Sequence, residues 1–598
     1  MVTSEGRIAK TIGATDFRSS NSIKNGNPIY TEKNNCQDCY KCLRQCPVKA
    51  IKVEESNASI IPSECIYCGH CVEVCPVGAK KVRDDFSLLQ SAIDRGEKVI
   101  ACLAPSWVSE FDGMSGRTIE RVLKAAGFNG VSETALGAEI VAKETSRYID
   151  RSPESIFISS CCPSVVLLIN KYYPTLAGNI VPLLSPMQSH ARMLKDIYGQ
   201  EIRIAFFGPC ISKKTENEHA DGLTDFVLTF NDLHDIIDTY SSIPDDDSVD
   251  GGDYFIPFRA GKGSYFPVDG GMIANMKASP SMTDTTYMSF SGVTKIREVL
   301  NDLLDGKLKA PLFLELMVCE GGCIKGPCTI SKSSEAVKKQ QVIQSLEKAG
   351  MAGSEKSVRA DIAFDQNYRD PLSVPDETES DISNALKASG KFSDADELNC
   401  GGCGYDSCRD FAIAMLRGKA ERIMCLSYTR RVAQDKASVL LKKIPYGVVV
   451  VDDNLKVIDS NTLFSTIIGG DLPEINESLG GMEGSDLKKT VSFYKLFASV
   501  LHSGEEMIER TIKENGLLLN ISVITIQPHK IVCGIIRNLQ NPEVRKEHVL
   551  KATRDVIRQN MEIVQKIAFL LGENAAYTES VLNSVAESVE NETINPSE

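Results

Sequence analysis

The chain has 598 residues, a formal net charge of -14 and a hydrophobic share of 42%. At roughly 100 to 200 residues per domain this length predicts about three to five domains, and the composition is that of globular proteins rather than disordered chains. The negative charge argues against nucleic acid as the main partner. No apolar run reaches the ~18 residues of a membrane span, and the first residues do not resemble a signal peptide. We therefore expect a cytoplasmic protein that is not inserted in a membrane. In that reducing compartment, 20 cysteines indicate metal binding or redox chemistry rather than disulfides.

Two cysteine motifs with the same spacing, CQDCYKCLRQCP and CIYCGHCVEVCP, come first along the chain. This is the spacing of bacterial ferredoxins, in which three thiolates bind one 4Fe-4S cube and a fourth, before proline, binds the other cube. Structural zinc is the alternative, but it needs only one tetrahedral set of four ligands. We predict a two-cluster ferredoxin-like domain at 30–82. One cube would use Cys36, Cys39, Cys42 and Cys75, and the other Cys65, Cys68, Cys71 and Cys46.

Four apolar runs further along read as buried strands of an α/β layer, and each ends in an unusual loop: VIACLAPS, SIFISSCCPS, RIAFFGPC and LFLELMVCEGGC. Ligands of open parallel sheets sit beyond the carboxyl ends of the strands, so these loops can converge. A single cysteine there would read as a buried apolar thiol. A set of four favours one more cluster, and that set is Cys162, Cys210, Cys319 and Cys323.

Three of these loops resemble the signature loops of the FeFe-hydrogenases: SSCCP (159–163), PCISKKTE (209–216) and ELMVCEGGCIKG (315–326). The resemblance implies an H-cluster domain at 83–350. An H-cluster is a 4Fe-4S cube joined through one cysteine to a two-iron centre that carries carbon monoxide, cyanide and a bridging dithiolate. By position, the four cysteines just named resemble the ligands of the cube, with Cys323 bridging to the two-iron centre.

The same resemblance implies roles for further side chains. Cys161 occupies the position of the thiol that passes protons to the dithiolate amine, and an ordinary thiol pKa near 8.5 suits that task; the alternative is a spare buried cysteine. Lys213 matches the lysine that hydrogen-bonds an iron-bound cyanide, although lysines are usually solvated. Met317 matches a residue that packs against the cluster, or it is core filler. Glu216 matches a proton-relay glutamate, with a plain surface carboxylate as the alternative.

Five residues next to these loops are predicted to contact the cofactor: Ala104, Pro105, Ser106, Gly208 and Pro209. Gly208 departs from the family pattern, because turnover-optimised members carry methionine there. The third loop ends in Gly326-Pro327-Cys328 instead of a glycine triplet. These departures resemble the sensory type of FeFe-hydrogenase, in which we expect the cofactor to bind while turnover falls.

A charged linker at 351–391 is predicted to lead into a small cysteine-rich domain at 392–432. Its cysteines are Cys400, Cys403, Cys408 and Cys425, and glycines between them let the backbone pass close to a cluster. The segment resembles the small 4Fe-4S domain of corrinoid proteins of acetyl-CoA synthesis and of membrane redox complexes. Zinc remains the alternative.

The C-terminal third resembles a PAS domain at 437–540. The stretch KKIPYGVVVVDDNLKVIDSNTLFSTIIG reads as strand, turn, strand and a helix capped by Asn461. No residue in this segment indicates which ligand, such as flavin or haem, the PAS domain would bind. Cys533 lies in an apolar strand and is predicted to be a core residue. A signalling or dimerisation helix is predicted at 541–590, where apolar residues recur every seven positions at Val549, Val556, Ile563 and Leu570, although neighbours such as Gln559 are polar.

The preferred interpretation is a multidomain α/β and α+β protein with three accessory 4Fe-4S clusters and an H-cluster. It would split molecular hydrogen heterolytically, pass electrons through its clusters and signal through the PAS domain, whose ligand is unknown. Expected partners are hydrogenase maturases, ferredoxin or a signalling protein, and a second copy of the chain. Two alternatives stay open: a metabolic hydrogenase that exchanges electrons with ferredoxin, and a non-catalytic iron-sulfur protein of the Narf-like kind.

Overall fold

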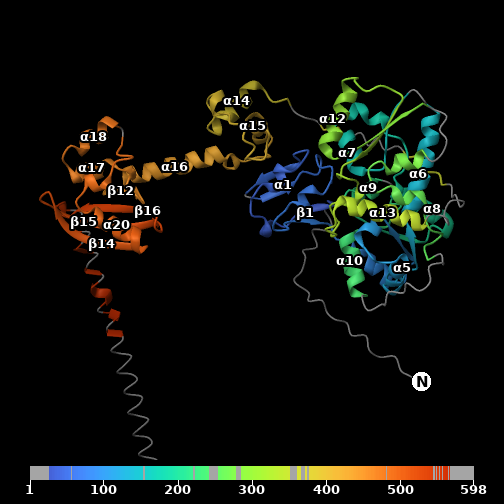
Figure 1. Cartoon of the computed structure of the whole chain (residues 1–598), viewed down its shortest axis with the longest axis horizontal. Helices are drawn as coiled ribbons and strands as arrows, with labels where there is room; N and C mark the ends of the chain where they lie inside the picture. Colours follow the sequence, from blue (N-terminus) through green and yellow to red (C-terminus); the bar gives the residue numbers. More distant parts are fainter. Residues whose placement is uncertain are drawn as a thin grey trace, which may run out of the picture. The chain divides into compact units, whose positions relative to one another are not determined.

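The computed structural model describes residues 26–565, apart from short gaps. The gaps are 56, 153–154, 220–221, 241–253, 278–283, 350–359, 365–370, 373–375, 480, 543–545, 547–548, 551–552, 555, 560 and 563. The chain divides into two compact units, Met1–Tyr428 and Thr429–Glu598 (Figure 1). None of the helices described in either unit combines the length and the apolar character that a membrane crossing requires.

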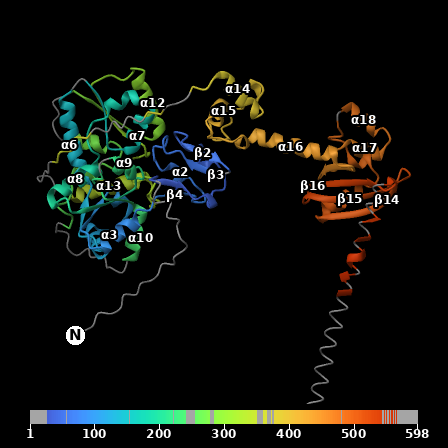
Figure 2. The same cartoon turned by 180° about the vertical axis from the view of Figure 1, so that it is seen from behind.

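Unit 1 begins with the segment of the two ferredoxin-like motifs, which we call the two-cluster segment (residues 28–82). Its two antiparallel strand pairs are visible in Figure 2. The pairs are β1 (Ile29–Thr31) with β4 (Lys80–Val82), and β2 (Ile51–Glu54) with β3 (Asn57–Ile60). The short helices α1 (Lys41–Arg44) and α2 (His70–Glu73) each lie inside one cysteine motif.

The four apolar runs are strands, as predicted, but they belong to two parallel sheets rather than one layer. The first sheet has the order β6-β5-β8-β9 and the second the order β10-β11-β7. Strand β5 is buried along its whole length, which explains its uninterrupted apolar sequence. The bounds are β5 (Val99–Leu103), β6 (Gly130–Glu133), β8 (Arg203–Gly208), β9 (Phe226–Thr229), β7 (Ile156–Ile158), β10 (Thr286–Ser291) and β11 (Leu312–Met317).

Helices connect and cover both sheets. They include α3 (Phe86–Asp94), α4 (Trp107–Glu110), α5 (Gly116–Ala125), α6 (Ala135–Asp150), α7 (Pro163–Tyr172), α8 (Pro186–Tyr198), α9 (Lys213–His219), α10 (Phe230–Thr239), α11 (Gly271–Met276), α12 (Val293–Leu304) and α13 (Glu335–Ala349). Helix α7 begins directly after Cys162, with Pro163 in its first turn, where a missing N–H costs no hydrogen bond. Each parallel strand therefore points its carboxyl end at a loop that enters a helix or a turn.

The last part of unit 1 is a small cysteine module (residues 379–428). The range predicted as a linker, 351–391, is not entirely a linker, because residues 379–388 form helix α14 (Glu379–Ala388). This helix packs against α15 (Cys408–Leu416) through Ile382, Ala385 and Ala412. The local apolar spacing of α14 thus serves the module rather than a connection.

Unit 2 contains one antiparallel sheet of five strands in the order β13-β12-β16-β15-β14, as expected of a PAS domain. The strands are β12 (Gly447–Asp452), β13 (Val457–Ser460), β14 (Met507–Glu514), β15 (Leu517–Gln527) and β16 (Ile531–Asn538). The helices are α16 (Leu426–Lys443), which starts in unit 1, α17 (Thr462–Ile468), α18 (Leu472–Leu479), α19 (Leu487–Thr490) and α20 (Tyr494–Ser503). Asn461 caps α17 as predicted, accepting a hydrogen bond from Phe464 N at 3.0 Å.

The predicted heptad positions at the C-terminus are covered only in part. Val549 and Val556 are exposed, at 54% and 56% of their surface. Ile563 and Leu570 lie outside the described residues. The dimerisation helix therefore stays a prediction.

Candidate functional site

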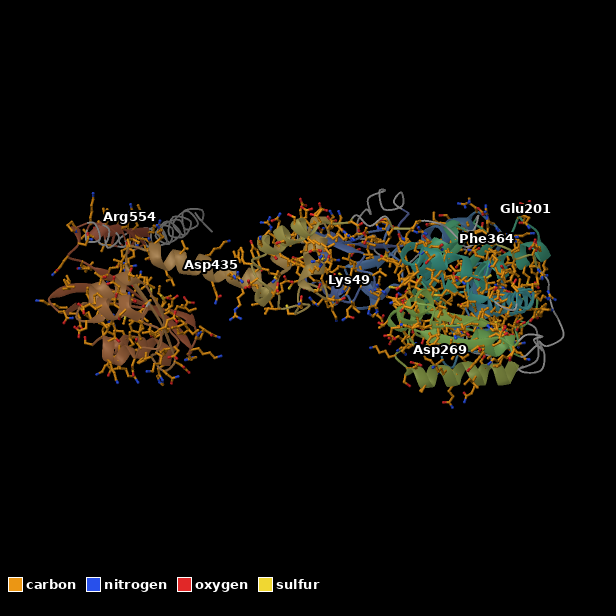
Figure 3. All side chains as sticks on the ribbon, turned by 90° about the horizontal axis from the view of Figure 1, so that it is seen from above. Lys49, Glu201, Asp269, Phe364, Asp435 and Arg554 are labelled. Atoms are coloured by element: carbon orange, nitrogen blue, oxygen red, sulfur yellow. The ribbon has the colours of Figure 1, made fainter. Side chains whose placement is uncertain are left out.

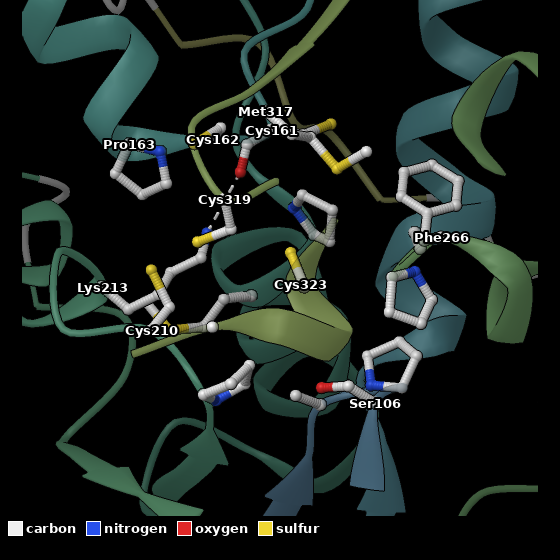
Figure 4. A pocket seen from close by; sticks show the side chains of 18 of the residues that line it. Ser106, Cys161, Cys162, Pro163, Cys210, Lys213, Phe266, Met317, Cys319 and Cys323 are labelled. Carbon is white, nitrogen blue, oxygen red and sulfur yellow. Dashed lines mark hydrogen bonds between the residues drawn. The ribbon is translucent and has the colours of Figure 1, made fainter. Parts of the chain in front are cut away.

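A buried pocket of about 110 Å³ lies where the loops after β5, β7, β8 and β11 meet. Figure 4 shows its cysteine side chains surrounding one space. The four predicted cube ligands all line it: Cys162, Cys210, Cys319 and Cys323. They reach it from three loops that lie far apart in the sequence, because the parallel strands of both sheets end at this place. The structure thus brings together the set that the sequence singled out.

Lys213 enters the pocket from the start of α9 and is buried, with 8% of its surface exposed. Its ammonium nitrogen donates to Glu216 Oε2 at 2.6 Å and to Ser185 Oγ at 2.9 Å. A third, longer contact of 3.4 Å reaches the backbone oxygen of Cys161, which is drawn as a dashed line in Figure 4. Burial lowers the pKa of Lys213, but the Glu216 carboxylate outweighs it and the pKa is raised. The lysine is therefore protonated, and its hydrogen bonds hold the ammonium group in one position at the pocket.

Glu216 is also buried, with 6% exposure, so the surface-carboxylate alternative is wrong. Its ion pair with Lys213 is enclosed by protein, where such pairs are costly unless geometry and hydrogen bonds satisfy both ions. Ser185 supplies the additional acceptor for the lysine. The pair fixes the direction in which the Lys213 side chain points.

Cys161 lines the same pocket beside Cys162, and its thiol donates to the sulfur of Met272 at 3.5 Å. Burial raises its pKa above the ordinary thiol value, which differs from the value assumed from the sequence. The thiol accordingly holds its proton rather than carrying charge in a dry environment. Met317, Ala104, Pro105, Ser106 and Pro209 also line the pocket.

Gly208 is predicted to contact the cofactor, yet it stands behind the wall of the pocket. A Cβ at this position would lie 2.6 Å from the Phe206 ring and 3.1 Å from Ala104 Cβ. Phe206 itself lines the pocket. The ring therefore occupies the space that a side chain at position 208 would need, which explains the glycine.

Sequence reasoning missed Glu315, an acid inside the apolar run LFLELM. Glu315 lines the pocket and is 3% exposed. Burial raises its pKa to about 7, although Ile273 N and Met272 N donate to its carboxylate at 3.0 and 3.2 Å. A single carboxylate interrupting a buried strand is the signal that could have revealed it.

The two-cluster segment reaches the pocket through Cys68, which lines it. The next residue, Gly69, approaches the third signature loop so closely that a Cβ would lie 2.5 Å from Pro327. Within the segment, burial raises the pKa of Cys65 and Cys68 to about 12, and the neighbouring Cys46 thiol adds to both shifts. Cys71 is likewise affected by Cys46, Cys65 and Cys68. Cys65 and Cys71 belong to one apolar cluster, and Cys46 and Cys68 pack against it, so the four predicted ligands lie in the same part of the structure.

Of the other predicted set, Cys36 and Cys39 both affect the pKa of Cys42, so these three lie near one another. Cys75 follows α2, and Ala79 N donates to its sulfur at 3.2 Å. Cys39 is exposed, whereas Cys42 is buried. Cys39 is the one exposed cysteine among the eight of the segment, and we therefore call its set the outer set and its cluster the outer cluster.

The small cysteine module gathers its four predicted ligands, Cys400, Cys403, Cys408 and Cys425, around one small cavity. Across the described part of the chain, no three His, Cys, Asp or Glu side chains converge closely enough to hold a single metal ion. Thiolate sets are the ligands that iron-sulfur clusters prefer. In the pocket at the strand ends, four thiols facing one space with an ammonium group beside them fit an iron-sulfur cube with an anionic neighbour.

Comparisons with known proteins cover the regions just described. Residues 97–327 match the family "Iron only hydrogenase large subunit, C-terminal domain", residues 28–76 match the 4Fe-4S dicluster domain, and residues 396–438 match a family of Fe-S cluster domains. The family matches therefore include the pocket and all three sets of accessory-cluster cysteines.

Among curated proteins, Iron hydrogenase 1 of Clostridium pasteurianum is 25% identical over 300 residues, which are 40% of this chain and 51% of that protein. The chain thus spans about half the length of this relative. Among solved structures, a variant of FeFe-hydrogenase HydA1 from Chlamydomonas reinhardtii is 17% identical with a TM-score of 0.36, covering 46% of this chain and 92% of that one. The PAS domain of nitrogen regulation protein NR(II) from Vibrio parahaemolyticus is 18% identical with a TM-score of 0.14, covering 17% and 96%.

Proposed function

We propose that the protein binds and splits molecular hydrogen at an H-cluster. Residues 97–327 match the model of the iron-only hydrogenase large-subunit family, and the matches to iron-sulfur domains lie on both sides of them. The observation that carries the proposal is the pocket itself. Four thiols from three distant loops, a fifth thiol and a buried ammonium group line one enclosed space. A plain iron-sulfur protein would need only the four thiols.

Cys162, Cys210, Cys319 and Cys323 would hold the 4Fe-4S cube, with Cys323 shared with the two-iron centre. When bound, this group would supply the heterolytic cleavage of hydrogen into a proton and a hydride, whose oxidation yields a second proton and two electrons. Lys213 would donate a charge-assisted hydrogen bond to a cyanide ligand, and such a bond can orient a small anion that has few covalent ties to the protein. Its contact with Ser185 and Glu216 keeps the ammonium group at the pocket.

Cys161 would carry the proton at its sulfur. Its burial favours the protonated thiol. Hydrogen splitting releases protons in the pocket, so the thiol would pass its proton outward and take up the next one from a base in the pocket. Met272 Sδ, 3.5 Å away, holds the thiol in position without competing strongly for its proton. The apolar side chains Phe206 and Phe266, which line the same pocket, keep bulk water out.

We further propose a sensory role with slow turnover. Phe206 fills the space beside Gly208, where faster members carry methionine, so the wall of the pocket is rebuilt without loss of a ligand residue. The PAS domain of unit 2 would convert the redox state of the clusters into a signal for a protein partner in the cytoplasm, with a second copy as its dimer partner. Coupling of this kind needs two arrangements whose energies depend differently on cluster charge.

Infrared spectroscopy tests the cofactor and the response together. The chain is expressed with the hydrogenase maturases, and spectra are recorded under hydrogen and then under argon. The proposal expects bands of iron-bound carbon monoxide and cyanide that shift between the two gases. A protein with all its iron-sulfur cubes but without these bands would instead belong with the non-catalytic Narf-like proteins. Fast, sustained hydrogen turnover would favour the metabolic, ferredoxin-linked alternative over the sensory role.

A further inference from the structure

The small cysteine module packs directly on the two-cluster segment within unit 1. Lys49, labelled in Figure 3 where the two parts meet, donates to Gly404 O at 2.8 Å across 355 positions of sequence. Val53 N donates to Lys419 O at 2.9 Å. The Lys419 ammonium group also forms an ion pair with Glu64 at 2.6 Å. Backbone and side-chain contacts together fix one register between the two parts.

The centre of this contact is apolar and closely packed. A Cβ on Gly404 would lie 2.9 Å from Leu43 Cγ, and the φ of +98° at Gly404 also favours glycine. Tyr405, next to it, is 5% exposed and belongs to the same apolar cluster as Leu43 and Ile66. The close approach of the module to the segment therefore depends on a glycine at position 404.

The packing brings cysteines of different sets near one another. Cys403 of the module and Cys46 of the segment both pack against the apolar cluster that contains Tyr405. Lys49 N donates to Cys46 O at 3.3 Å, and the side chain of the same lysine reaches Gly404 O, so Cys46 lies next to the contact with the module. The set to which Cys46 belongs also contains Cys68, which lines the pocket of the proposed H-cluster. The other set includes the exposed Cys39.

We propose that the cluster held by Cys46, Cys65, Cys68 and Cys71 is a branch point, from which electrons leave either to the outer cluster or, through the contact at Tyr405, to the cluster of the small module. The inference rests on the proposed function. Cleavage of one hydrogen molecule releases two protons and two electrons. Each oxidised cube accepts one electron, so one molecule of hydrogen reduces the outer cluster and the module cluster once each. The module cluster is thus an electron acceptor within the same chain.

This branch gives the sensory role a physical route. Cys425 is the last cysteine of the module, and helix α16 begins at the next residue, Leu426. The Cys425 sulfur lies 3.2 Å from Ser427 Oγ in the first turn of that helix. A change of charge on the module cluster therefore acts on the start of the helix that leads into unit 2, while the exposed outer cluster stays open to an external partner.

The test disrupts the contact between the small cysteine module and the two-cluster segment and leaves every cysteine in place. Gly404→Val places a side chain against Leu43. Should that variant fail to bind its cluster, the double variant Lys49→Ala/Lys419→Ala removes the side-chain contacts of both lysines and leaves the backbone hydrogen bond of Lys419 in place. Lys52→Ala is the matched control, because Lys52 lies on the same segment and forms an ion pair with Glu54, which belongs to the same strand. The matured full chain is exposed to hydrogen, and cluster reduction is followed by freeze-quench electron paramagnetic resonance. The module signal is assigned by its loss in Cys400→Ser.

We expect hydrogen to reduce the module cluster at least tenfold more slowly in the separated variants, with the other clusters and the control unchanged. An unchanged rate would overturn the branch. If hydrogen reduces no cluster in any variant, the proposed function fails, and the branch is then judged in dithionite-reduced protein. There the module signal should be broadened by a neighbouring reduced cluster in the wild type and narrow in Gly404→Val. A narrow signal in both proteins would refute the contact.

Discussion

The pocket of unit 1 and the core of unit 2 are both built on buried strands, but their strands end differently. Around the pocket, β7, β8 and β11 run into loops that carry thiols and an ammonium group toward one enclosed space. In unit 2, β15 and β16 continue as an antiparallel pair, and the Phe497 ring lies over Gly534 inside an apolar core. In unit 1 the reactive side chains therefore lie at the carboxyl ends of parallel strands, whereas the interior of the antiparallel sheet in unit 2 is filled by apolar side chains.

Removing one sulfur from each region should have very different effects. Under the proposed function, Cys319→Ser abolishes hydrogen turnover and the carbon monoxide and cyanide bands, since the cube loses a ligand in a pocket that depends on all three loops. Cys533→Ser, in β16, should leave both unchanged. Infrared spectra and dye reduction by hydrogen measure the two effects. Normal bands in Cys319→Ser would show that the pocket does not hold the cofactor as proposed.

The next effect concerns the thiol that is not a cube ligand. Cys161→Ala is expected to keep the infrared bands but to slow hydrogen turnover by about 100-fold to 10,000-fold, the usual range for loss of a positioned proton donor. Cys328→Ala is the control, because Cys328 is buried nearby, at 2% exposure, but does not appear among the pocket-lining residues. Equal rates for Cys161→Ala and wild type would assign proton transfer to another group.

The sequence predicted those features best that depend on the spacing of neighbouring residues. The module cysteines lie within 400–425, and Asn461 caps a helix that starts at the next residue, so neighbouring positions define both features. The four pocket cysteines could be grouped because strand ends in parallel sheets converge. The distribution of those strands over two sheets could not be predicted, since strand pairing depends on contacts across the whole unit.

The features that sequence reasoning missed all involve side chains meeting from distant positions. Glu315 looks like an ordinary strand residue until Met272 N and Ile273 N are seen to enclose its carboxylate. Phe206 explains Gly208 only once its ring is seen to occupy the space that a side chain at position 208 would need. The contact of Gly404 with Leu43 joins parts of the chain that no local pattern connects. Shape complementarity of this kind depends on packing, not on periodicity.

A pH-dependent stability test probes the charge environment of the pocket. The folded-state pKa of Glu315, about 7, lies above the ordinary value of 4.5. Stability that depends on the protonated carboxyl is therefore complete below pH 4.5 and declines as the pH rises through 7. Between pH 4.5 and pH 8 the wild type should lose ~3 kcal/mol relative to Glu315→Gln, whose side chain does not ionise.

Urea unfolding of unmatured protein at a series of pH values, followed by a probe in unit 1, measures this difference. His190→Gln is a useful comparison, because burial lowers the pKa of His190 to about 3 and its effect has the opposite sign. Its contribution is complete above pH 6.5 and declines only as the pH falls toward 3. Parallel curves for wild type and Glu315→Gln would mean that Glu315 is already ionised in the folded protein.

The smallest expected effect lies in unit 2. A Cβ at Gly534 would lie 2.2 Å from Phe497 Cζ, so Gly534→Ala overpacks a filled core and should cost about 1 to 3 kcal/mol. Hydrogen exchange of the full chain should show faster exchange in β15 and β16 and unchanged exchange around the pocket, because the two units have separate cores. Gly178→Ala, where no atom lies within 4 Å of the added carbon, is the control. If Gly534→Ala leaves exchange in β15 and β16 unaltered, Phe497 moves aside at little cost, and the core of unit 2 has room that a small ligand could use.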